Sequence, residues 1–394
     1  DNKGFRGCDS QHLHKGSVLK VLSEDRTTAV AGGTALSGFP ASNVQNDRPR
    51  KPWISTQQSG ELFTISLNAS ASYPIQAMFL YGIEADSCAW ALKNQAGSTI
   101  DSGSLDMSYP IESDLSGNPN NSNVYFVNQV HFRRAFFITF SSPVTDNGSL
   151  VLSLATTVNL GGKNIQGNAV ASWVRDTTNK GRLLDSSGTA INIIDHGFIG
   201  IGTHVTAVLI ENPVTEDTTV DQNSNATNPL VLNGGVTLTI NGGFSLIIST
   251  DPITAQITSI TGDGTASQGI TLNVDLATAS VANILNPIKI GIARCGKVTD
   301  FPNPRRGLSF GYQDFSIRRR QPTGGYSSEP RPLSREVSGD CIMTTAEAQT
   351  MQDFYRAFRS KPMPMLFINN MPSNFGESMK GNMFGYFKNA PSFS

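Results

Sequence analysis

The stretch GELFTISLNASASYPIQAMFLYGI, residues 60–83, holds two apolar runs separated by a polar segment rich in Ser and Asn. The runs are Phe63 to Leu67 and Ile75 to Ile83, and both are rich in Phe, Ile and Leu. Short apolar runs bounded by Ser, Asn and Gly clusters are typical of strands joined by loops. This stretch therefore predicts a β-protein.

The same pattern recurs along the chain. His131 to Phe140 and Leu150 to Leu154 predict further strands. Val236 to Ile240 and Phe244 to Ile248 flank Asn241-Gly242-Gly243, which suits the positive φ angles of a tight hairpin. A second hairpin is expected from Ile257 to Ile260 and Ile270 to Val274, around Asp263-Gly264. We expect a mainly β chain of several β-sandwich domains.

One helix is predicted, over about residues 344–361. Thr344 and Glu347 have the spacing of a capping box, in which each side chain satisfies a backbone N–H of the first turn. Four apolar side chains then share one face at helical spacing, and prolines end the segment. These residues are Ala348, Met351, Tyr355 and Phe358, then Pro362 and Pro364. Strands are expected to follow at Met365 to Asn370 and Met383 to Phe387.

The composition excludes several classes of protein. The 394 residues carry a net charge of -1, and 15% of them are charged, against about 25% in average soluble domains. This balance argues against a nucleic-acid-binding protein. The longest apolar stretch, Ala77 to Ile83, is far shorter than the roughly 18 residues of a membrane span. We expect a soluble chain with no signal peptide, although it begins at Asp1 rather than Met.

The cysteines and the charges add to this outline. Cys8, Cys88, Cys295 and Cys341 lie far apart, so we expect reduced thiols and neither a zinc site nor a redox pair. Charge is uneven, because residues 201–290 carry about -6 and residues 291–394 about +6. We expect five segments: an arm or edge strand (1–35), a β-sandwich (36–160), a connecting β segment (161–200), an acidic β-sandwich-like insert (201–290), and a basic segment with the helix (291–394).

No catalytic, cofactor-binding or metal site is expected. Gly291 to Lys297 match the first seven positions of a P-loop, but Val298 lacks the hydroxyl that binds Mg²⁺, and two prolines prevent the following helix. We expect a strand that ends in a turn. Asp221, Asn223 and Asn225 resemble a calcium loop without its glycine or its final Glu. The five histidines form no H-E-x-x-H motif, and Asp195-His196 has no accompanying nucleophile elbow.

Two groups of side chains are candidates for contact with partners. The basic residues of the C-terminal segment are candidates for an interface with a neighbouring subunit, since the acidic segment offers an opposite charge. They are Arg318, Arg319, Arg320, Arg356 and Arg359. Trp53 and Trp90 are candidates either for glycan contact or for core anchors.

Residues 36–160 resemble the opening of discoidin-like β-sandwich modules. The resemblance rests on the Asn-containing loop before Trp53, on Gly60 to Leu67, and on Ile75 to Ala85. The family's usual Leu-Gly after the first strand is replaced here by Leu67-Asn68. It implies a β-sandwich and, as one alternative function, a carbohydrate-binding module that takes part in host attachment.

The C-terminal segment is similar to minor tail proteins of long-tailed bacteriophages, in particular distal tail proteins. The similarity rests on the pattern of Ile288 to Gly296, Gly311 to Ser316 and Arg335 to Asp340, followed by the capped helix and the last strands. In that family a strand, a helix and further strands build a belt that closes into a ring. The resemblance implies a non-enzymatic virion protein, assembled in the host cytoplasm into a hexameric or trimeric ring. Its partners would be other tail and baseplate proteins and, in the alternative function, a host-surface glycan, with neither nucleic acid nor membrane insertion.

Overall fold

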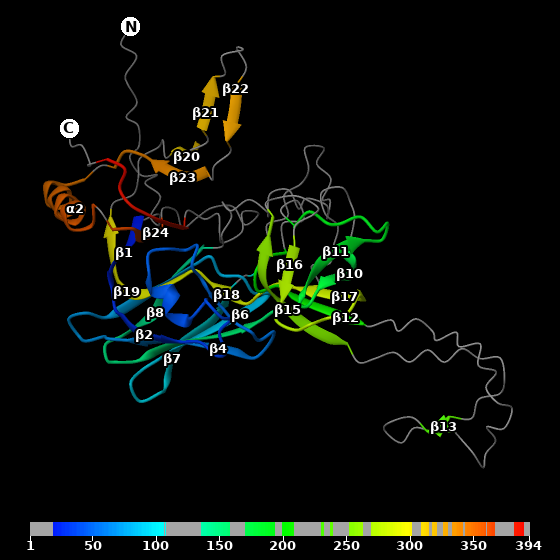
Figure 1. Ribbon diagram of the computed structural model, residues 1–394. Coiled ribbons are helices and arrows are strands. Elements are labelled where there is room, and N and C mark those ends of the chain that lie inside the picture. The colour runs from blue at the N-terminus through cyan, green and yellow to red at the C-terminus, as the bar shows by residue number, and fades with distance from the viewer. Residues whose placement is uncertain are drawn as a thin grey trace, which may run out of the picture. The chain divides into compact units, whose positions relative to one another are not determined.

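The computed structural model of the chain consists of two compact units, which are described separately. Unit 1 comprises residues 1–158 and 286–394, and unit 2 comprises residues 159–285. The structure describes residues 19–105, 107, 135–157, 170–193, 199–208, 230–231, 237–238, 252–262, 269–301, 309–314, 317–320, 326–329, 333–341, 343–359, 361–366 and 382–389. As the sequence predicts, the described chain is mainly β, with several sheets and one α-helix near the C-terminus (Figure 1).

Unit 1 contains two large antiparallel sheets. Their strand orders are β25-β24-β1-β19-β5-β8 and β2-β4-β9-β6-β7. The strands of the first sheet are β1 (Leu19–Asp25), β5 (Ile75–Tyr81), β8 (Ala135–Val144), β19 (Ile292–Phe301), β24 (Met363–Leu366) and β25 (Asn382–Gly385). Those of the second are β2 (Thr27–Ala31), β4 (Glu61–Leu67), β6 (Ser87–Lys93), β7 (Thr99–Leu105) and β9 (Ser149–Ala155).

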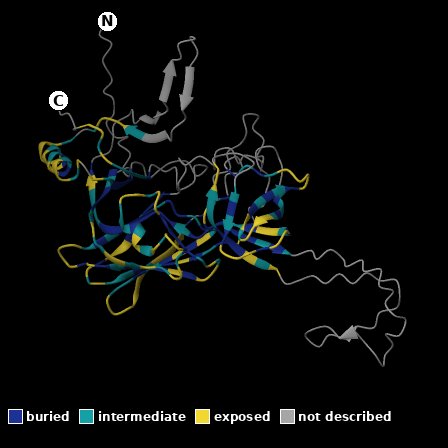
Figure 2. Cartoon of the chain, in the orientation of Figure 1, coloured by how far each residue is buried: buried dark blue, intermediate teal, exposed yellow. Residues whose placement is uncertain are grey.

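The two sheets share one hydrophobic core, so unit 1 is a β-sandwich. In β4, buried Phe63, Ile65 and Leu67 alternate with outward-facing residues, as expected for a sheet with one face toward solvent. Met78 and Leu80 of β5 contribute to the same core from the other sheet. Figure 2 shows buried strand segments inside unit 1 and exposed loops at its margins. The strands predicted at Phe63 to Leu67 and Ile75 to Ile83 are thus confirmed, and they lie in opposite layers.

The N-terminal and C-terminal parts of the chain complete the first sheet. The segment 1–35 was expected to be an arm or an edge strand, but β1 lies between β24 and β19, and only β2 lies at an edge. The segment resembling a P-loop lies almost wholly in β19, which continues to Phe301 rather than ending in a turn. Both differences have one cause: β1 and β19 pair with each other across most of the sequence, from Leu19 with Phe301 to Asp25 with Gly296.

The first sheet curls until its two edge strands meet. The side-chain amide of Asn382 in β25 donates a hydrogen bond to the carbonyl oxygen of Ala135 in β8, 2.8 Å away. Phe384 of β25 lies 6.1 Å, between ring centroids, from both Phe79 and Tyr81 of β5. The concave face therefore encloses a second apolar cluster.

Helix α2 (Thr345–Phe358) covers one end of the first sheet. Its Met351 and Phe354 are buried against a cluster that includes Val21 of β1 and Phe301 of β19. The predicted capping box is present, because Thr344 Oγ1 accepts from the backbone N–H of Glu347 and Glu347 Oε2 accepts from that of Thr344. These bonds from Thr344 lower the pKa of the Glu347 carboxyl.

Replacing Thr344 by alanine removes the side-chain acceptor of this box and should destabilise α2. The expected loss is about 1 kcal/mol, which is typical of N-cap removal. Hydrogen exchange of the α2 amides, measured by mass spectrometry, should speed up. Thr345→Ala is the matched control, since Thr345 is the first helical residue and not the cap. Equal exchange rates in the two variants would contradict the role of the cap.

Unit 2 is built around a closed barrel of antiparallel strands in the order β10-β11-β16-β15-β12-β17. Its strands are β10 (Val170–Thr177), β11 (Lys180–Asp185), β12 (His204–Val208), β15 (Ile253–Thr261), β16 (Gly269–Leu272) and β17 (Ala279–Leu285). Trp173 is fully buried in the barrel, and its indole N–H donates to the carbonyl oxygen of Leu276.

This barrel differs from the segmentation expected from sequence. Residues 161–200 were expected to connect two domains, yet they supply β10 and β11, and the insert expected to be sandwich-like is a barrel. The expected boundary at residue 200 falls between strands of one sheet, because β10 pairs with β17. The hairpin of β15 and β16 is confirmed. The turn 241–243 and the second strand expected after it lie outside the described residues. Of the strand expected before the turn, β14 (Thr237–Leu238) is described, and it pairs with the upstream β13 (Leu230–Val231).

The remaining described strands are short pairs. β3 (Trp53–Ile54) pairs with β18 (Lys289–Ile290), and a 3-10 helix, η1 (Ala41–Gln45), precedes β3. β20 (Ser309–Asp314) pairs with β23 (Leu333–Ser338), and β21 (Ile317–Arg320) with β22 (Tyr326–Glu329). Within the described part of the chain, no helix has the length and apolar character needed to cross a bilayer.

Candidate functional site

The tryptophans proposed for glycan contact lie in the core of unit 1. Trp53 is 0% exposed and Trp90 is 8% exposed. The ring centroid of Trp53 lies 4.6 Å from that of Phe63, and Trp90 lies 5.5 Å from Phe140. Neither indole offers a free face to a sugar ring, so the core-anchor alternative describes both.

Each of these indoles packs beneath a glycine. A Cβ atom on Gly32 would come within 2.6 Å of the Trp53 ring, and one on Gly103 within 2.9 Å of the Trp90 ring. Any side chain at either position would displace an indole from the core. Glycine is needed at both positions because the backbone lies directly against an indole ring.

The basic residues proposed for an interface lie on separate elements. Arg318, Arg319 and Arg320 belong to β21, where they pair in register with Ser328, Ser327 and Tyr326. Arg356 and Arg359 lie at the C-terminal end of α2, and both are exposed. Arg356 forms an ion pair with Asp353 one turn earlier, which contributes little at such exposure.

Arg294 was not among the residues predicted to be functional, although it lies within the segment resembling a P-loop. Its side chain is 7% exposed. The guanidinium donates to the carbonyl oxygens of Val44, Gln45 and Asn46, at 2.7, 2.8 and 3.1 Å. An arginine in the apolar first part of β19, among Ile292, Ala293 and Cys295, was the available signal, because a buried charge requires partners.

Two carboxylates complete the surroundings of Arg294. Asp25 Oδ2 lies 3.1 Å from its Nε, and Asp47 Oδ1 lies 3.3 Å from its Nη2. Burial raises the pKa of Asp25, an effect that the charge of Arg294 opposes. Burial also raises the pKa of the neighbouring Cys295 thiol well above its ordinary value. Arg294 therefore ties η1 and the β1–β2 junction to β19, a structural role.

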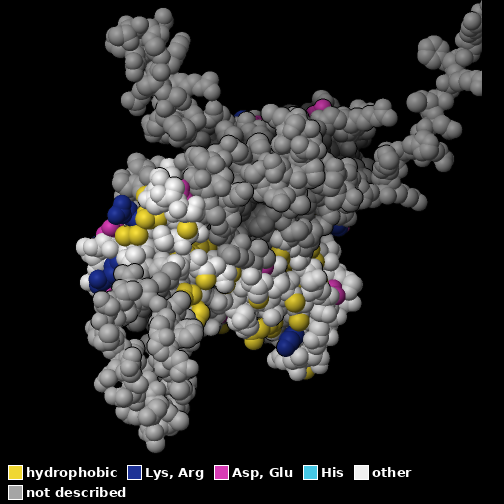
Figure 3. Space-filling model, turned by 90° about the vertical axis from the view of Figure 1, so that its right-hand side faces the viewer, with side chains coloured by type: hydrophobic (Ala, Val, Ile, Leu, Met, Phe, Trp, Pro, Cys, Tyr) yellow, Lys and Arg dark blue, Asp and Glu magenta, His cyan; other side chains and the backbone are white. Residues whose placement is uncertain are grey.

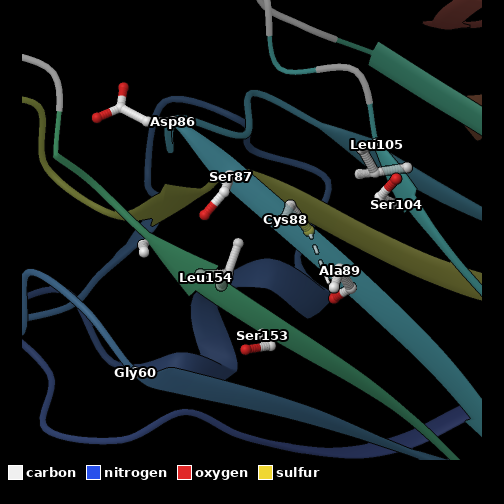
Figure 4. A pocket seen from close by; sticks show the side chains of 10 residues that line it. Gly60, Asp86, Ser87, Cys88, Ala89, Ser104, Leu105, Ser153 and Leu154 are labelled. Carbon is white, nitrogen blue, oxygen red and sulfur yellow. Dashed lines mark hydrogen bonds between the residues drawn. The ribbon is translucent and has the colours of Figure 1, made fainter.

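Unit 1 has a depression on its second sheet, toward one end of the strands. Its volume is about 290 Å³. Small side chains from three adjacent strands line much of it: Ser87 and Ala89 of β6, Ser104 of β7 and Ser153 of β9 (Figure 4). Gly60, Asp86, Cys88, Leu105, Leu154 and Ala155 complete the lining. Because serine and alanine project little above a sheet, the hollow follows directly from the sequence of these strands.

The side chains of this depression are suited to non-covalent contacts rather than to covalent catalysis. Cys88 lines it, but burial raises the pKa of this thiol to about 12, so it is protonated at neutral pH and a poor nucleophile. The Asp86 carboxylate at the rim already accepts from Thr156 and Thr157. The hydroxyls and backbone groups that remain can form hydrogen bonds or van der Waals contacts.

Other candidate groups are dispersed. His204 is buried in β12, and the other four histidines lie outside the described residues. Cys88, Cys295 and Cys341 are free thiols, as expected, and Cys8 lies outside the described residues. Among the residues whose placement the structure describes, no three His, Cys, Asp or Glu side chains converge as metal ligands would.

Comparison with known proteins adds no assignment. No protein-family model matches the chain, and no curated protein sequence matches it significantly.

Proposed function

We propose that the chain is a structural subunit of a bacteriophage tail tip, of distal-tail type. It would assemble into a ring between the tail tube and the receptor-binding apparatus. It would be part of the virion tail after assembly in the host cytoplasm. The proposal rests on the sequence resemblance of the C-terminal segment to distal tail proteins.

One structural observation supports this proposal more than any other. In chain order, β19 is followed by the paired strands β20 to β23 and then by α2, β24 and β25. The last four elements, β23, α2, β24 and β25, therefore have the strand–helix–strand–strand order that the resemblance implies for the belt. These elements are joined to the sandwich through β1, which lies between β24 and β19. Arg356 and Arg359 lie on the exposed side of α2. In the proposed ring, these two side chains would contact a neighbouring subunit.

Electron microscopy of the purified full-length protein tests the proposal. The expected result is a ring of three or six subunits with a central hole. Particles of a single subunit at every concentration, in a protein that no virion contains, would overturn it.

The ring should weaken at high salt. Residues 201–290 and 291–394 carry opposite charges of about -6 and +6, and salt screens contacts between exposed charges. The double variant Arg356→Glu/Arg359→Glu should dissociate the ring at low salt, as measured by analytical ultracentrifugation. Lys51→Glu, which reverses an exposed charge in the loop before β3, is the control. A ring unaffected by both salt and the double variant would refute a charged contact.

The alternative function, a carbohydrate-binding module, relied on Trp53 and Trp90 to contact a sugar. Both side chains are buried and cannot do so. No second function is proposed.

A further inference from the structure

The second sheet of unit 1 has an outward face with very little charge. Along β4, β9 and β6 the outward positions alternate with buried ones, and the pairing register aligns them into rows across the sheet. On the five described strands, Lys93 is the one charged side chain that the register places on this face, and it lies at one end. Figure 3 shows one side of the molecule, on which the described Lys, Arg, Asp and Glu side chains are scattered.

One row of this face carries both a projection and a hollow. The row runs Leu62 of β4, Ser153 of β9, Ala89 of β6 and Ser104 of β7. Leu62 is 56% exposed, more than any other described Leu, Ile or Val side chain. The depression of about 290 Å³ includes Ala89, Ser104 and Ser153 of the same row, and it extends toward one end of the strands, to Asp86, Ala155 and Gly60. Leu62 of β4 and Ala89 of β6 are therefore on opposite sides of β9.

This arrangement is self-complementary. A two-fold axis along the central strand β9 exchanges the columns of β4 and β6, so Leu62 of one copy would face Ala89 of the other. The two contacts are identical, as an isologous dimer requires. The axis also keeps the two Lys93 side chains apart, because Lys93 lies on β6 and not on β9.

We propose that this face is an interface between two copies of the chain, with Leu62 of each copy seated in the depression beside Ala89 of the other. A face without charge at its centre fits an uncharged partner surface, and this chain supplies one. Strands about 4.8 Å apart, with about seven residues at roughly 3.4 Å each, give a face of about 570 Å² per copy. This lies near the lower limit of specific interfaces, so the dimer should be weak, with a Kd of order micromolar.

The sheet contact is separate from the proposed ring and does not depend on it. The two assemblies can be told apart because they respond differently to salt. Charged ring contacts weaken as salt rises, whereas apolar burial does not. Sedimentation of the full-length protein in about 0.5 M NaCl, at up to roughly 100 µM, isolates the sheet contact. The expected result is a monomer–dimer equilibrium. A protein that stays monomeric there overturns the proposal, whether or not a ring forms at low salt.

Two variants test the geometry. Leu62→Ser removes the projection and Ala89→Leu fills the hollow, so each should weaken the dimer by roughly ten-fold or more. Val274→Ser removes another exposed aliphatic side chain, 41% exposed and located in unit 2, and should leave the equilibrium unchanged. Melting curves should match the parent protein, since both face residues are exposed. An unchanged dimer in either face variant, or the same loss in the control, would overturn this geometry.

Discussion

Replacing Trp53 by alanine should destabilise unit 1 by about 3–5 kcal/mol, the usual cost of deleting a large buried aromatic side chain. Trp53 is fully buried against Phe63, and Gly32 lies directly against its ring. The cavity left behind cannot fill without moving β3 or β4. Denaturant unfolding followed by hydrogen exchange and mass spectrometry measures the loss separately in peptides of each unit.

Trp173→Ala is the matched control, because Trp173 is equally buried but belongs to unit 2. It should weaken the barrel, where it also leaves the carbonyl of Leu276 without its indole donor, and spare the sandwich. A Trp53→Ala protein of unchanged stability that loses binding on a glycan array would refute the core role. That result would instead support a direct contact between Trp53 and a sugar.

Replacing Arg294 by alanine should cost about 3–5 kcal/mol, as expected when one member of a buried charge network is removed. Three backbone carbonyls of residues 44–46 lose their donor, and two carboxylates lose their counter-charge. Arg294→Lys should recover only part of this loss, since an ammonium group cannot reach the same set of acceptors as the planar guanidinium. Exchange protection near η1 and β19 is the measurement.

Asp47→Asn is the control for this network. Asp47 is 58% exposed, so its ion pair with Arg294 should contribute about 1 kcal/mol or less. If Asp47→Asn were as harmful as Arg294→Ala, the charge pair would outweigh the carbonyl contacts. That result would contradict the role assigned to Arg294 as an anchor of η1.

The best predictions from sequence concerned local patterns. The capping box at Thr344 and Glu347 appears in the structure as expected, and so does the burial of Met351. The strand from Phe63 to Leu67 and the pairing of the strands now labelled β15 and β16 were also predicted correctly. In each case the signal lies within a few residues, where hydrogen bonds and side-chain periodicity do not depend on distant parts of the chain.

The candidate site was much harder to foresee. The role of Arg294 depends on carbonyls about 250 positions earlier in the chain, and the sequence showed only an arginine in an apolar run. The hollow at Ala89 depends on Ser104 and Ser153, which are brought together by the register of three strands. Small residues are common, so nothing in the sequence marked these three.

The sequence alone determined three properties: the opposite charges of residues 201–290 and 291–394, the β-class, and the C-terminal helix. These follow from composition and short-range periodicity, which do not depend on how distant parts of the chain come together. Which strands share a sheet was decided by the tertiary structure. β1 joined β19 across most of the chain, and residues 170–185 closed a barrel rather than linking two domains. The physical reason is that a strand satisfies its backbone groups and buries its apolar face with whichever partner the whole fold provides.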